Sequence, residues 1–523
     1  MRYFNTGGVC EPDRHYMLPA EPRIPGARAY VDRWEYFIVH APRQTGKTTT
    51  IRALARHLTA EGRHAALAVS CEQAGEVGDD IGGASAELME AIRNAAEQDL
   101  PEALRPPAPW PDAPPGSLIF NALQDWAIAC PLPLVLLFDE IDSLQGQVLR
   151  SVLRQLRNGH QYRASAFPAS VVLCGMRDVR DYKAASGGNP DRLSGPSPFN
   201  VAVDSIRIGD FTADEVAALY AQHTEDTGQE FTPEAVERAF GYSKGQPWLV
   251  NAIAREITDA EKMAVPQDVP VTVGHVDTAK ERLILARAIH LDSLTDKLRE
   301  PRVRRIIGPL LAGTLIDPDD TYDDDLSYVR DLGLIARTNP VRVANPVYRE
   351  VIARTLSAST QSQVTLSPRR FELPDGRLDF PKLLDAFADW RVENGEFMTR
   401  KEVYHEAAVQ LIFMGFLQRI VNGGGFIDRE YGVGAGRTDI LIRKPYGDGQ
   451  MQREAIELKA WSKGKEPLER GLKQLDDYLD RFRLDTGTLI IFDRRDDAPD
   501  ITERTAFSKV TSPAGREITL LRA

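Results

Sequence analysis

One stretch decides the fold of the amino-terminal part of the chain: Ala41-Pro42-Arg43-Gln44-Thr45-Gly46-Lys47-Thr48-Thr49. An apolar segment, residues 36–40, precedes it, and a helical pattern over residues 48–58 follows it. Strand, loop and helix in this order predict a phosphate-binding loop, in which backbone N–H groups and the start of the helix hold a triphosphate. We expect Lys47 to reach the β- and γ-phosphates of ATP, Thr48 to bind Mg²⁺, and Thr49 to lie near the α-phosphate.

A second motif supports the first. Residues 134–138 form a continuous apolar run that ends in Asp139 and Glu140, as expected for a buried parallel strand that carries carboxylates to its carboxyl end. We expect Asp139 to hold Mg²⁺ through water and Glu140 to orient or deprotonate the attacking water. The alternative, a strand that ends in a solvated acidic turn, is disfavoured beside the phosphate-binding loop.

Several short stretches resemble a family of bacterial AAA-like ATPases related to the signal-transducing and archaeal-type NTPases. They are Phe4-Asn5-Thr6-Gly7-Gly8, His15-Tyr16, residues 40–49, Ser197-Pro198-Phe199-Asn200 and Gly245-Gln246-Pro247-Trp248-Leu249. The resemblance covers residues 1–355. It implies an ATPase core with a parallel sheet over residues 1–200, a helical lid over residues 201–265 and a winged-helix-like domain over residues 266–356.

The resemblance also implies roles for two further residues. Arg177 follows an apolar strand at residues 169–174, where ATPases of this group often place a sensor of the γ-phosphate. The alternative is a surface arginine that pairs with Asp178 or Asp181. Pro247 is expected near the adenine or the sugar, or else as a packing residue at the start of a helix.

The residues between the core and residue 356 read as mostly helical. Thr212 and Thr232 are expected to be helix N-caps of the lid. In the following domain, a helix that ends at Gly333 and two short strands after it resemble a winged helix. The acidic residues 317–325 favour a packing role for that domain over DNA binding, and leave its arginines as the alternative contacts to phosphate: Arg302, Arg304 and Arg305.

The carboxy-terminal part carries a different pattern of charged residues. A linker and connecting helix at residues 357–384 are followed by a module over residues 385–523, with Asp439 on one predicted strand and Glu457-Leu458-Lys459 on the next. Side chains alternate along a strand, so Glu457 and Lys459 share one face. Asp439, Glu457 and the Leu458 carbonyl can therefore hold Mg²⁺ or Mn²⁺, with Lys459 positioning the water that the metal activates.

This arrangement resembles the PD-(D/E)XK nuclease superfamily, over residues 385–500. The resemblance implies an α/β restriction-endonuclease-like fold, a further acidic residue on the first helix, Glu406, and a motif on the helix after the triad, Gln474. Thr438 stands where the family pattern has proline. The alternative is a strand whose charges alternate on a solvated face.

Composition restricts the class of protein. The chain has 523 residues, 42% of them hydrophobic, and no apolar run as long as a membrane span, so we expect a multidomain protein in the cytoplasm, without membrane contact. Its α/β fold class is what the motifs and the two resemblances imply. Its four cysteines lack the spacing of a metal site and are expected to be reduced thiols. The net charge of −12 disfavours general coating of DNA but allows a local basic groove.

Two functions follow from these patterns. The first is an ATP-gated DNA endonuclease, for which the fused modules suggest, by analogy, a role in bacterial defence or in handling mobile elements. The second is an ATP-dependent switch or nucleic-acid-binding protein whose terminal module does not cleave. The sequence leaves open a homo-oligomer and an activating protein partner.

Overall fold

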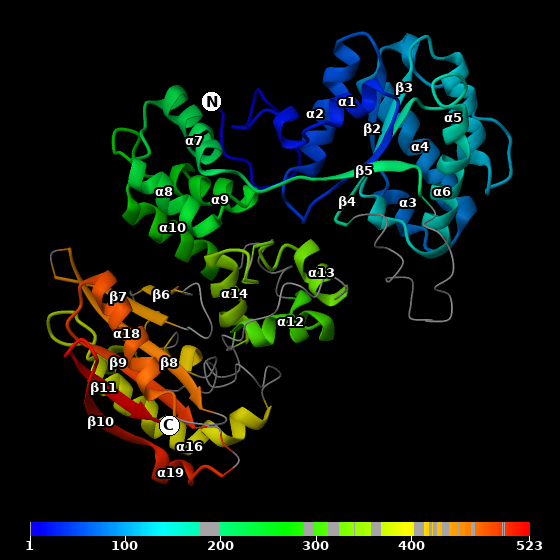
Figure 1. The fold of residues 1–523 in the computed structure, drawn as a ribbon. Helices are drawn as coiled ribbons and strands as arrows, with labels where there is room; N and C mark the ends of the chain where they lie inside the picture. Colours follow the sequence, from blue (N-terminus) through cyan, green and yellow to red (C-terminus); the bar gives the residue numbers. More distant parts are fainter. Residues whose placement is uncertain are drawn as a thin grey trace. The chain divides into compact units, whose positions relative to one another are not determined.

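The computed structural model of the protein describes residues 2–177, 199–286, 296–311, 324–338, 340–356, 368–401, 413–417, 421, 426–430, 439–447, 449–461, 466–493, 495 and 497–523. The chain forms two compact units (Figure 1). Unit 1 contains Met1–Ala279 together with Asp331–Gly333. Unit 2 contains Lys280–Arg330 together with Leu334–Ala523. The short segment Asp331–Gly333 is therefore part of the first unit, although the residues on both sides of it belong to the second.

A five-stranded parallel sheet forms the centre of unit 1, in the order β2-β3-β4-β1-β5. Its strands are β1 (Tyr36–His40), β2 (Ala65–Ser70), β3 (Leu134–Asp139), β4 (Ser170–Gly175) and β5 (Ala202–Arg207). The first four are buried along almost their whole length, because helices cover both faces of the sheet, whereas most residues of the edge strand β5 are half-buried or exposed. This confirms the predicted parallel sheet.

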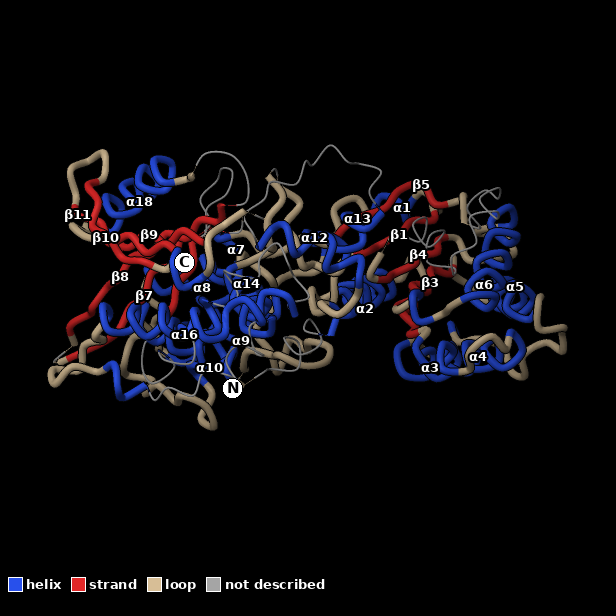
Figure 2. Tube along the Cα trace, turned by 90° about the horizontal axis from the view of Figure 1, so that it is seen from below, coloured by secondary structure: helices blue, strands red, loops and turns tan. Residues whose placement is uncertain are grey.

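The helices around this sheet lie in two groups. The elements are η1 (Glu21–Arg23), α1 (Ala27–Asp32), α2 (Lys47–Ala60), α3 (Glu72–Glu76), α4 (Ile81–Asp99), η2 (Glu102–Leu104), α5 (Leu118–Ala129), η3 (Ile141–Ser143), α6 (Gly146–Gly159) and η4 (His160–Tyr162). One core cluster joins α1 and α2 to one face of the sheet, and another joins α4, α5 and α6 to the other face. Figure 2 shows α2 on one side of the strands and α5 and α6 on the other.

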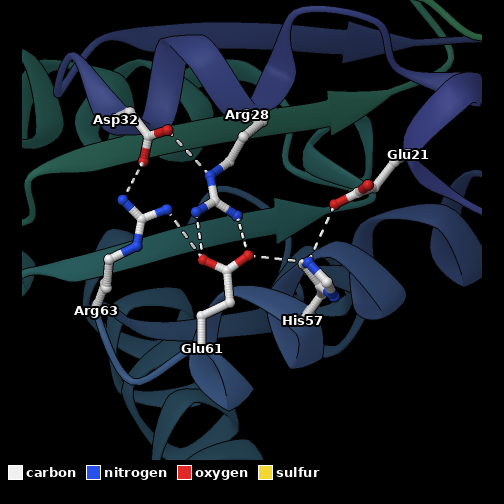
Figure 3. A network of polar contacts seen from close by, with 6 residues as sticks. All are labelled: Glu21, Arg28, Asp32, His57, Glu61 and Arg63. Carbon is white, nitrogen blue, oxygen red and sulfur yellow. Dashed lines mark hydrogen bonds and ion pairs between the residues drawn. The ribbon is translucent and has the colours of Figure 1, made fainter.

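A network of charged side chains fastens α1 to the far end of α2 (Figure 3). Arg28 on α1 pairs with Glu61, the residue after α2, and with Asp32 at 3.1 Å. His57 Nε2 lies 2.9 Å from Glu61 Oε1, and Arg63 lies 3.1 Å from the other oxygen of that carboxylate. The Arg28 guanidinium lowers the pKa of Glu61, so its carboxylate remains charged at neutral pH.

The segment of unit 1 predicted to be a lid is helical, with α7 (Ala213–Thr227), α8 (Pro233–Ser243) and α9 (Pro247–Thr258), and the start of α10 (Val273–Leu285) follows it. Thr212 and Glu215 form a capping box at the start of α7, and the side chain of Thr232 accepts from the backbone N–H of Ala235 at the start of α8. Both predicted N-caps are confirmed.

The helices of unit 2 before its sheet are α12 (Pro301–Leu311), α13 (Asp324–Asp331), α14 (Pro346–Leu356), η7 (Pro368–Phe371) and α16 (Phe380–Lys401). Helix α13 ends at Asp331, and a single antiparallel bridge, Ile335 to Val343, stands where two short strands were expected. Arg302 and Arg305 both pair with Asp325, at 3.0 and 2.8 Å, so the acidic segment occupies the two guanidinium groups that were alternative phosphate contacts. The winged-helix domain stays a prediction.

The carboxy-terminal sheet of unit 2 has six strands in the order β10-β11-β9-β8-β7-β6. They are β6 (Phe426–Glu430), β7 (Asp439–Tyr446), β8 (Gln450–Trp461), β9 (Gly487–Asp493), β10 (Ala506–Thr511) and β11 (Glu517–Arg522), accompanied by α18 (Leu468–Phe482) and α19 (Ile501–Arg504). The sheet is mixed, because β8, β9 and β11 are parallel and the other pairs are antiparallel. Helix α16 packs on one face and α18 on the other.

Candidate functional site

The carboxyl edge of the parallel sheet gathers the residues predicted to bind nucleotide. The phosphate-binding loop follows β1, Asp139 ends β3, and Arg177 lies just after β4. Because β4 lies between β1 and β3, the loop and Asp139 are two strand spacings apart, about 10 Å. That separation is compatible with a phosphate group bound by the loop and a cation held by the carboxylate.

The loop has the backbone conformation that phosphate binding requires. Gln44 and Gly46 have φ angles of 56° and 84°, which turn successive N–H groups toward one side before α2 begins at Lys47. A Cβ on Gly46 would meet no atom within 4 Å, so its φ angle and not lack of space favours glycine there. Thr45 Oγ1 closes the loop by donating to the carbonyl oxygen of Pro42 at 2.8 Å.

Lys47 lies folded against its own loop. Its Nζ donates to the carbonyl oxygens of Ala41 and Pro42, at 2.9 and 2.8 Å. Burial lowers the pKa of Lys47, while the nearby carboxylates at the ends of the strands act in the opposite direction. The ammonium group is thus held at the loop by weak neutral acceptors that a phosphate oxygen can replace.

The remaining loop residues differ in exposure. Pro42 is buried, Arg43 and Gln44 are exposed, and Thr48 is half-buried in the first turn of α2. Thr49 Oγ1 accepts from the backbone N–H of Cys10 at 3.1 Å, which ties the amino-terminal segment to the start of the helix.

Asp139 and Glu140 hold a compact arrangement at the end of β3. Asp139 is buried, and its Oδ1 accepts from the backbone N–H of Glu140 at 2.9 Å. Glu140 itself has a φ angle of 53° and receives a hydrogen bond from Ser70 Oγ at 2.8 Å. Burial raises the pKa of the Glu140 carboxyl, and the hydrogen bond from Ser70 opposes that rise. Sequence analysis missed Ser70, although its place at the end of the apolar strand β2 was a signal for it.

Arg177 is a buried residue and not a surface one. It is 9% exposed, and its Nε lies 3.5 Å from Oδ2 of Asp331, which is also buried. The two surface partners considered for it, Asp178 and Asp181, lie outside the described residues. The segment Asp331–Gly333, which contains the partner of Arg177, also reaches the phosphate-binding loop, because a Cβ on Gly333 would lie 2.8 Å from Cβ of Pro42.

The helical segment predicted to be a lid contacts the phosphate-binding loop through Gln246. Its side chain caps α9 by accepting from the N–H of Leu249 at 2.6 Å, and its Nε2 donates to the carbonyl oxygen of Gln44 at 3.3 Å. Pro247 is the buried first residue of α9, so it is both a helix-start packing residue and a direct neighbour of the residue that touches the loop. Sequence analysis did not assign a role to Gln246.

The carboxy-terminal sheet carries the other predicted site. Asp439 on β7 is directly opposite Glu457 on β8. Glu457 and Lys459 are buried and form an ion pair, and Gln474 is buried on α18, the helix that covers this face of the sheet. The packing is close, since a Cβ on Gly471 of α18 would lie 3.4 Å from Cγ of Lys459.

Three further residues were predicted for this site, and the described structure does not bring their side chains to Glu457 and Lys459. Leu458 points into the core on the opposite face, which leaves only its carbonyl for the proposed role. Glu406 and the side chain of Asp439 lie outside the described residues. Among the residues that the structure describes, no group of three or more histidine, cysteine or acidic side chains could hold a metal ion.

Comparison with known proteins bears on the amino-terminal site. Residues 35–182 match the family model of the AAA domain. These residues contain β1, the phosphate-binding loop, β3 and β4, so this part of the chain is an ATP-binding P-loop domain of the AAA type. A search of curated proteins finds no match to the chain. Within the described ranges, no helix has both the length and the apolar character that crossing a membrane requires.

Several solved structures resemble part of the chain at low sequence identity. The Walker-type ATPase paby2304 of Pyrococcus abyssi is 13% identical with a TM-score of 0.47, over 67% of this chain and 99% of that one. Cdc6p of Pyrobaculum aerophilum is 12% identical with a TM-score of 0.35, over 64% and 94%. The RuvB Holliday junction branch migration motor of Thermotoga maritima is 15% identical with a TM-score of 0.33, over 62% and 90%. The assignment of the nucleotide site therefore rests on the family match and the geometry.

Proposed function

We propose that this protein hydrolyses ATP and uses its nucleotide state to control a metal-dependent DNA endonuclease in its carboxy-terminal part. The observation that carries the proposal is the strand register that sets Asp439 opposite Glu457, with Lys459 two residues further along the same face. Two carboxylates and a lysine in this order suit a hard divalent cation and the water that it activates. The site lies in one chain with an ATP-binding domain.

The ATPase part of the proposal rests on the arrangement around the phosphate-binding loop. Lys47 would neutralise the transferred phosphate, and Glu140 would orient the attacking water from its hydrogen bond with Ser70. The residues present fit Mg²⁺, because Asp139 is a buried carboxylate at the sheet edge and Thr48 offers a half-buried hydroxyl across the gap. Bound Mg²⁺ would supply neutralisation of the charge on the phosphate oxygens.

A second function is favoured by the burial of Glu457. This carboxylate is fully buried and paired with Lys459, beneath helix α18, so access for a cation requires the helix or a side chain to move. A protein whose terminal module only binds nucleic acid, and whose ATP state controls assembly, would have no need of that movement. For either function we propose that the protein acts in the cytoplasm, in defence against foreign DNA, and that a neighbouring copy of the chain or an activating protein is its partner.

Cleavage assays separate the two functions. Linear, circular and single-stranded DNA are incubated with the full chain and Mg²⁺ or Mn²⁺, with and without ATP. The proposed endonuclease predicts cleavage by the wild type that is lost in Asp439→Ala and that changes with ATP only while Lys47 is intact. Absence of cleavage with every substrate, while ATP binding persists, would favour the switch.

A control variant makes the result specific. Glu457→Gln leaves Lys459 buried without its partner, which can destabilise the sheet, so Asp439→Ala is the primary variant. Glu454→Gln is the matched control, because Glu454 is on the same strand three residues away and its side chain points to the other face. It should cleave like the wild type.

A further inference from the structure

A pocket lies at the carboxyl ends of three neighbouring parallel strands of the carboxy-terminal sheet. Trp461 ends β8, Asp493 ends β9, and Arg522 ends β11. All three side chains line the pocket, whose volume is about 280 Å³. The rest of its wall consists of Ile491 from β9, Ala506 from β10, and Arg495, Pro499, Glu503 and Arg504 from the residues between these two strands.

The pocket lies on the same face of the sheet as the proposed nuclease residues. Glu457, Lys459 and Trp461 alternate along β8 and therefore project to one side, and the register sets Trp461 beside Asp493. Four residues of strand separate Glu457 from Trp461, which is about 13 Å. Helix α18 covers Glu457 on this face, so a nucleic-acid strand would reach both places only after the movement that opens Glu457. It would then span the acidic residues and the pocket within a few nucleotides.

The pocket contains a fixed flat surface. The guanidinium of Arg495 lies over the ring of Trp461, with its central carbon 3.7 Å from the ring centroid. Asp493 holds this guanidinium in place by accepting from Nε and Nη2 at 3.0 and 2.7 Å. Aromatic rings and guanidinium planes are the surfaces on which unpaired bases stack, and the rest of the wall includes the apolar side chains of Ile491 and Pro499.

A cation at the rim suits a phosphate. Arg522 is partly exposed and donates from Nε to Glu466 Oε1 at 2.7 Å. Exposed ion pairs of this kind contribute little to stability, so a phosphate oxygen can take the place of the carboxylate. Arg504 adds a second guanidinium, which donates to the carbonyl oxygen of Pro499 at 3.1 Å.

The size of the pocket limits its occupant. A volume of about 280 Å³ is at the lower end for ligand pockets and suits one nucleotide, not a stack of base pairs. A base inside a duplex would have to leave the stack to enter it, whereas an unpaired base would not.

We propose that this pocket binds one unpaired nucleotide of the DNA strand held at the nuclease face, with the base against Trp461 and Arg495 and its phosphate at Arg522. The inference rests on the proposed function and narrows it: the substrate contains a single-stranded segment beside the scissile bond. Trp461 is a positioning residue in this arrangement.

Binding without cleavage tests the pocket. The full chain is titrated, in EDTA, into a fluorescein-labelled single-stranded oligonucleotide and into the matching blunt duplex, and anisotropy is followed. We expect the single strand to bind about tenfold more tightly than the duplex, and Trp461→Ala to weaken single-strand binding about tenfold while Trp461→Phe restores most of it. Phe507→Ala, which removes another partly exposed aromatic ring from β10, should bind like the wild type.

A second variant guards against misfolding. Arg522→Gln changes the rim alone and should weaken single-strand binding while its thermal unfolding matches that of the wild type. Equal affinity for both DNA forms, or unchanged single-strand binding by Trp461→Ala and Arg522→Gln, would overturn the inference. If Trp461→Ala and Arg522→Gln lose single-strand binding but the wild type never cleaves DNA with metal, the pocket inference stands and the nuclease proposal fails. If the wild type cleaves DNA but both variants bind the single strand like the wild type, the nuclease proposal stands and the pocket inference fails.

Discussion

Arg177 and Asp331 form a buried ion pair next to the phosphate-binding loop, with Nε and Oδ2 3.5 Å apart. Arg177 follows β4 at the carboxyl edge of the sheet, where a γ-phosphate would approach it, whereas Asp331 is the last residue of α13. A phosphate and the Asp331 carboxylate would therefore compete for one guanidinium group.

This competition predicts tighter nucleotide binding when the carboxylate is removed. Asp331→Asn should raise the affinity for ATP about fivefold, which corresponds to about 1 kcal/mol of binding free energy. The affinity for ADP should rise less, because ADP lacks the γ-phosphate. Calorimetric titration measures both. Asp325→Asn, which weakens the partly exposed pairs of another aspartate on the same helix with Arg302 and Arg305, is the control and should leave both affinities unchanged. Weaker ATP binding by Asp331→Asn would show that the two anions do not compete.

Lys47 is expected to be essential for ATP hydrolysis. Lys47→Ala should lower the ATPase rate by about 100-fold or more, because it removes the ammonium group that the loop carbonyl oxygens hold in place and that would neutralise the transferred phosphate. Phosphate release is the measurement. Arg52→Ala, which removes a positive charge from the next turn of α2, should retain the wild-type rate. A rate for Lys47→Ala near that of the wild type would place ATP elsewhere.

Ser70 predicts a pH dependence of the ATPase rate. Burial raises the pKa of Glu140 and the Ser70 hydroxyl opposes that rise, so removal of the hydroxyl should raise the pKa further. Glu140 acts as a base only when ionised, and a higher pKa means that this form is lost at a higher pH as the solution is acidified. The acid limb of the rate profile of Ser70→Ala should therefore shift to higher pH.

The control for this profile is a neighbouring serine. The Ser143 hydroxyl donates to the carbonyl oxygen of Cys71 at 2.8 Å, and Ser143 meets Glu140 through backbone atoms alone, with its N–H donating to the Glu140 carbonyl oxygen at 2.8 Å. Ser143→Ala keeps that backbone bond and should keep the wild-type acid limb. Identical profiles for all three proteins would mean that protonation of Glu140 does not limit the rate.

Gly333 predicts a stability difference between two glycines. Its φ angle of 76° is strained for alanine, and the added Cβ would lie 2.8 Å from Pro42 Cβ, so Gly333→Ala should lower the free energy of unfolding by about 2–4 kcal/mol. Gly62 has a similar φ angle of 71° with no atom within 4 Å of an added Cβ, so Gly62→Ala should cost about 1 kcal/mol. Urea unfolding followed by fluorescence compares them, and equal losses would contradict the contact with Pro42.

The sequence was sufficient for the elements whose signal is local. Residues 36–40 form β1 as predicted, and the buried run at residues 169–174 corresponds to β4, one residue later. Such runs are easily recognised because a parallel strand covered on both faces is apolar throughout. The caps at Thr212 and Thr232 depend on only three residues of sequence, and both were predicted for that reason.

The contacts that complete the candidate site could not be predicted in this way. Ser70 meets Glu140, Gln246 meets Gln44, and Asp331 meets Arg177 across long separations in sequence, so only the packing of distant elements brings them together. Instead of the strand pair expected after Gly333, the structure has a single bridge between Ile335 and Val343, because the two segments are too short to form a ladder of several hydrogen bonds. The roles assigned to the site residues stay predictions.

The charged network at the far end of α2 has a mechanical consequence. This helix is about 21 Å long, and Arg28 fastens its end to α1 through Glu61 while its start carries the phosphate-binding loop. Because α2 is fastened at Glu61, it can tilt but cannot slide along its axis. A nucleotide that moves Lys47 at its other end would therefore rotate the helix about the anchored end. The anchor consists of partly exposed charges, which dissolved salt screens. The ionic strength of the solution would then determine how firmly the end of α2 is held at α1, without changing any contact between the loop and the phosphates.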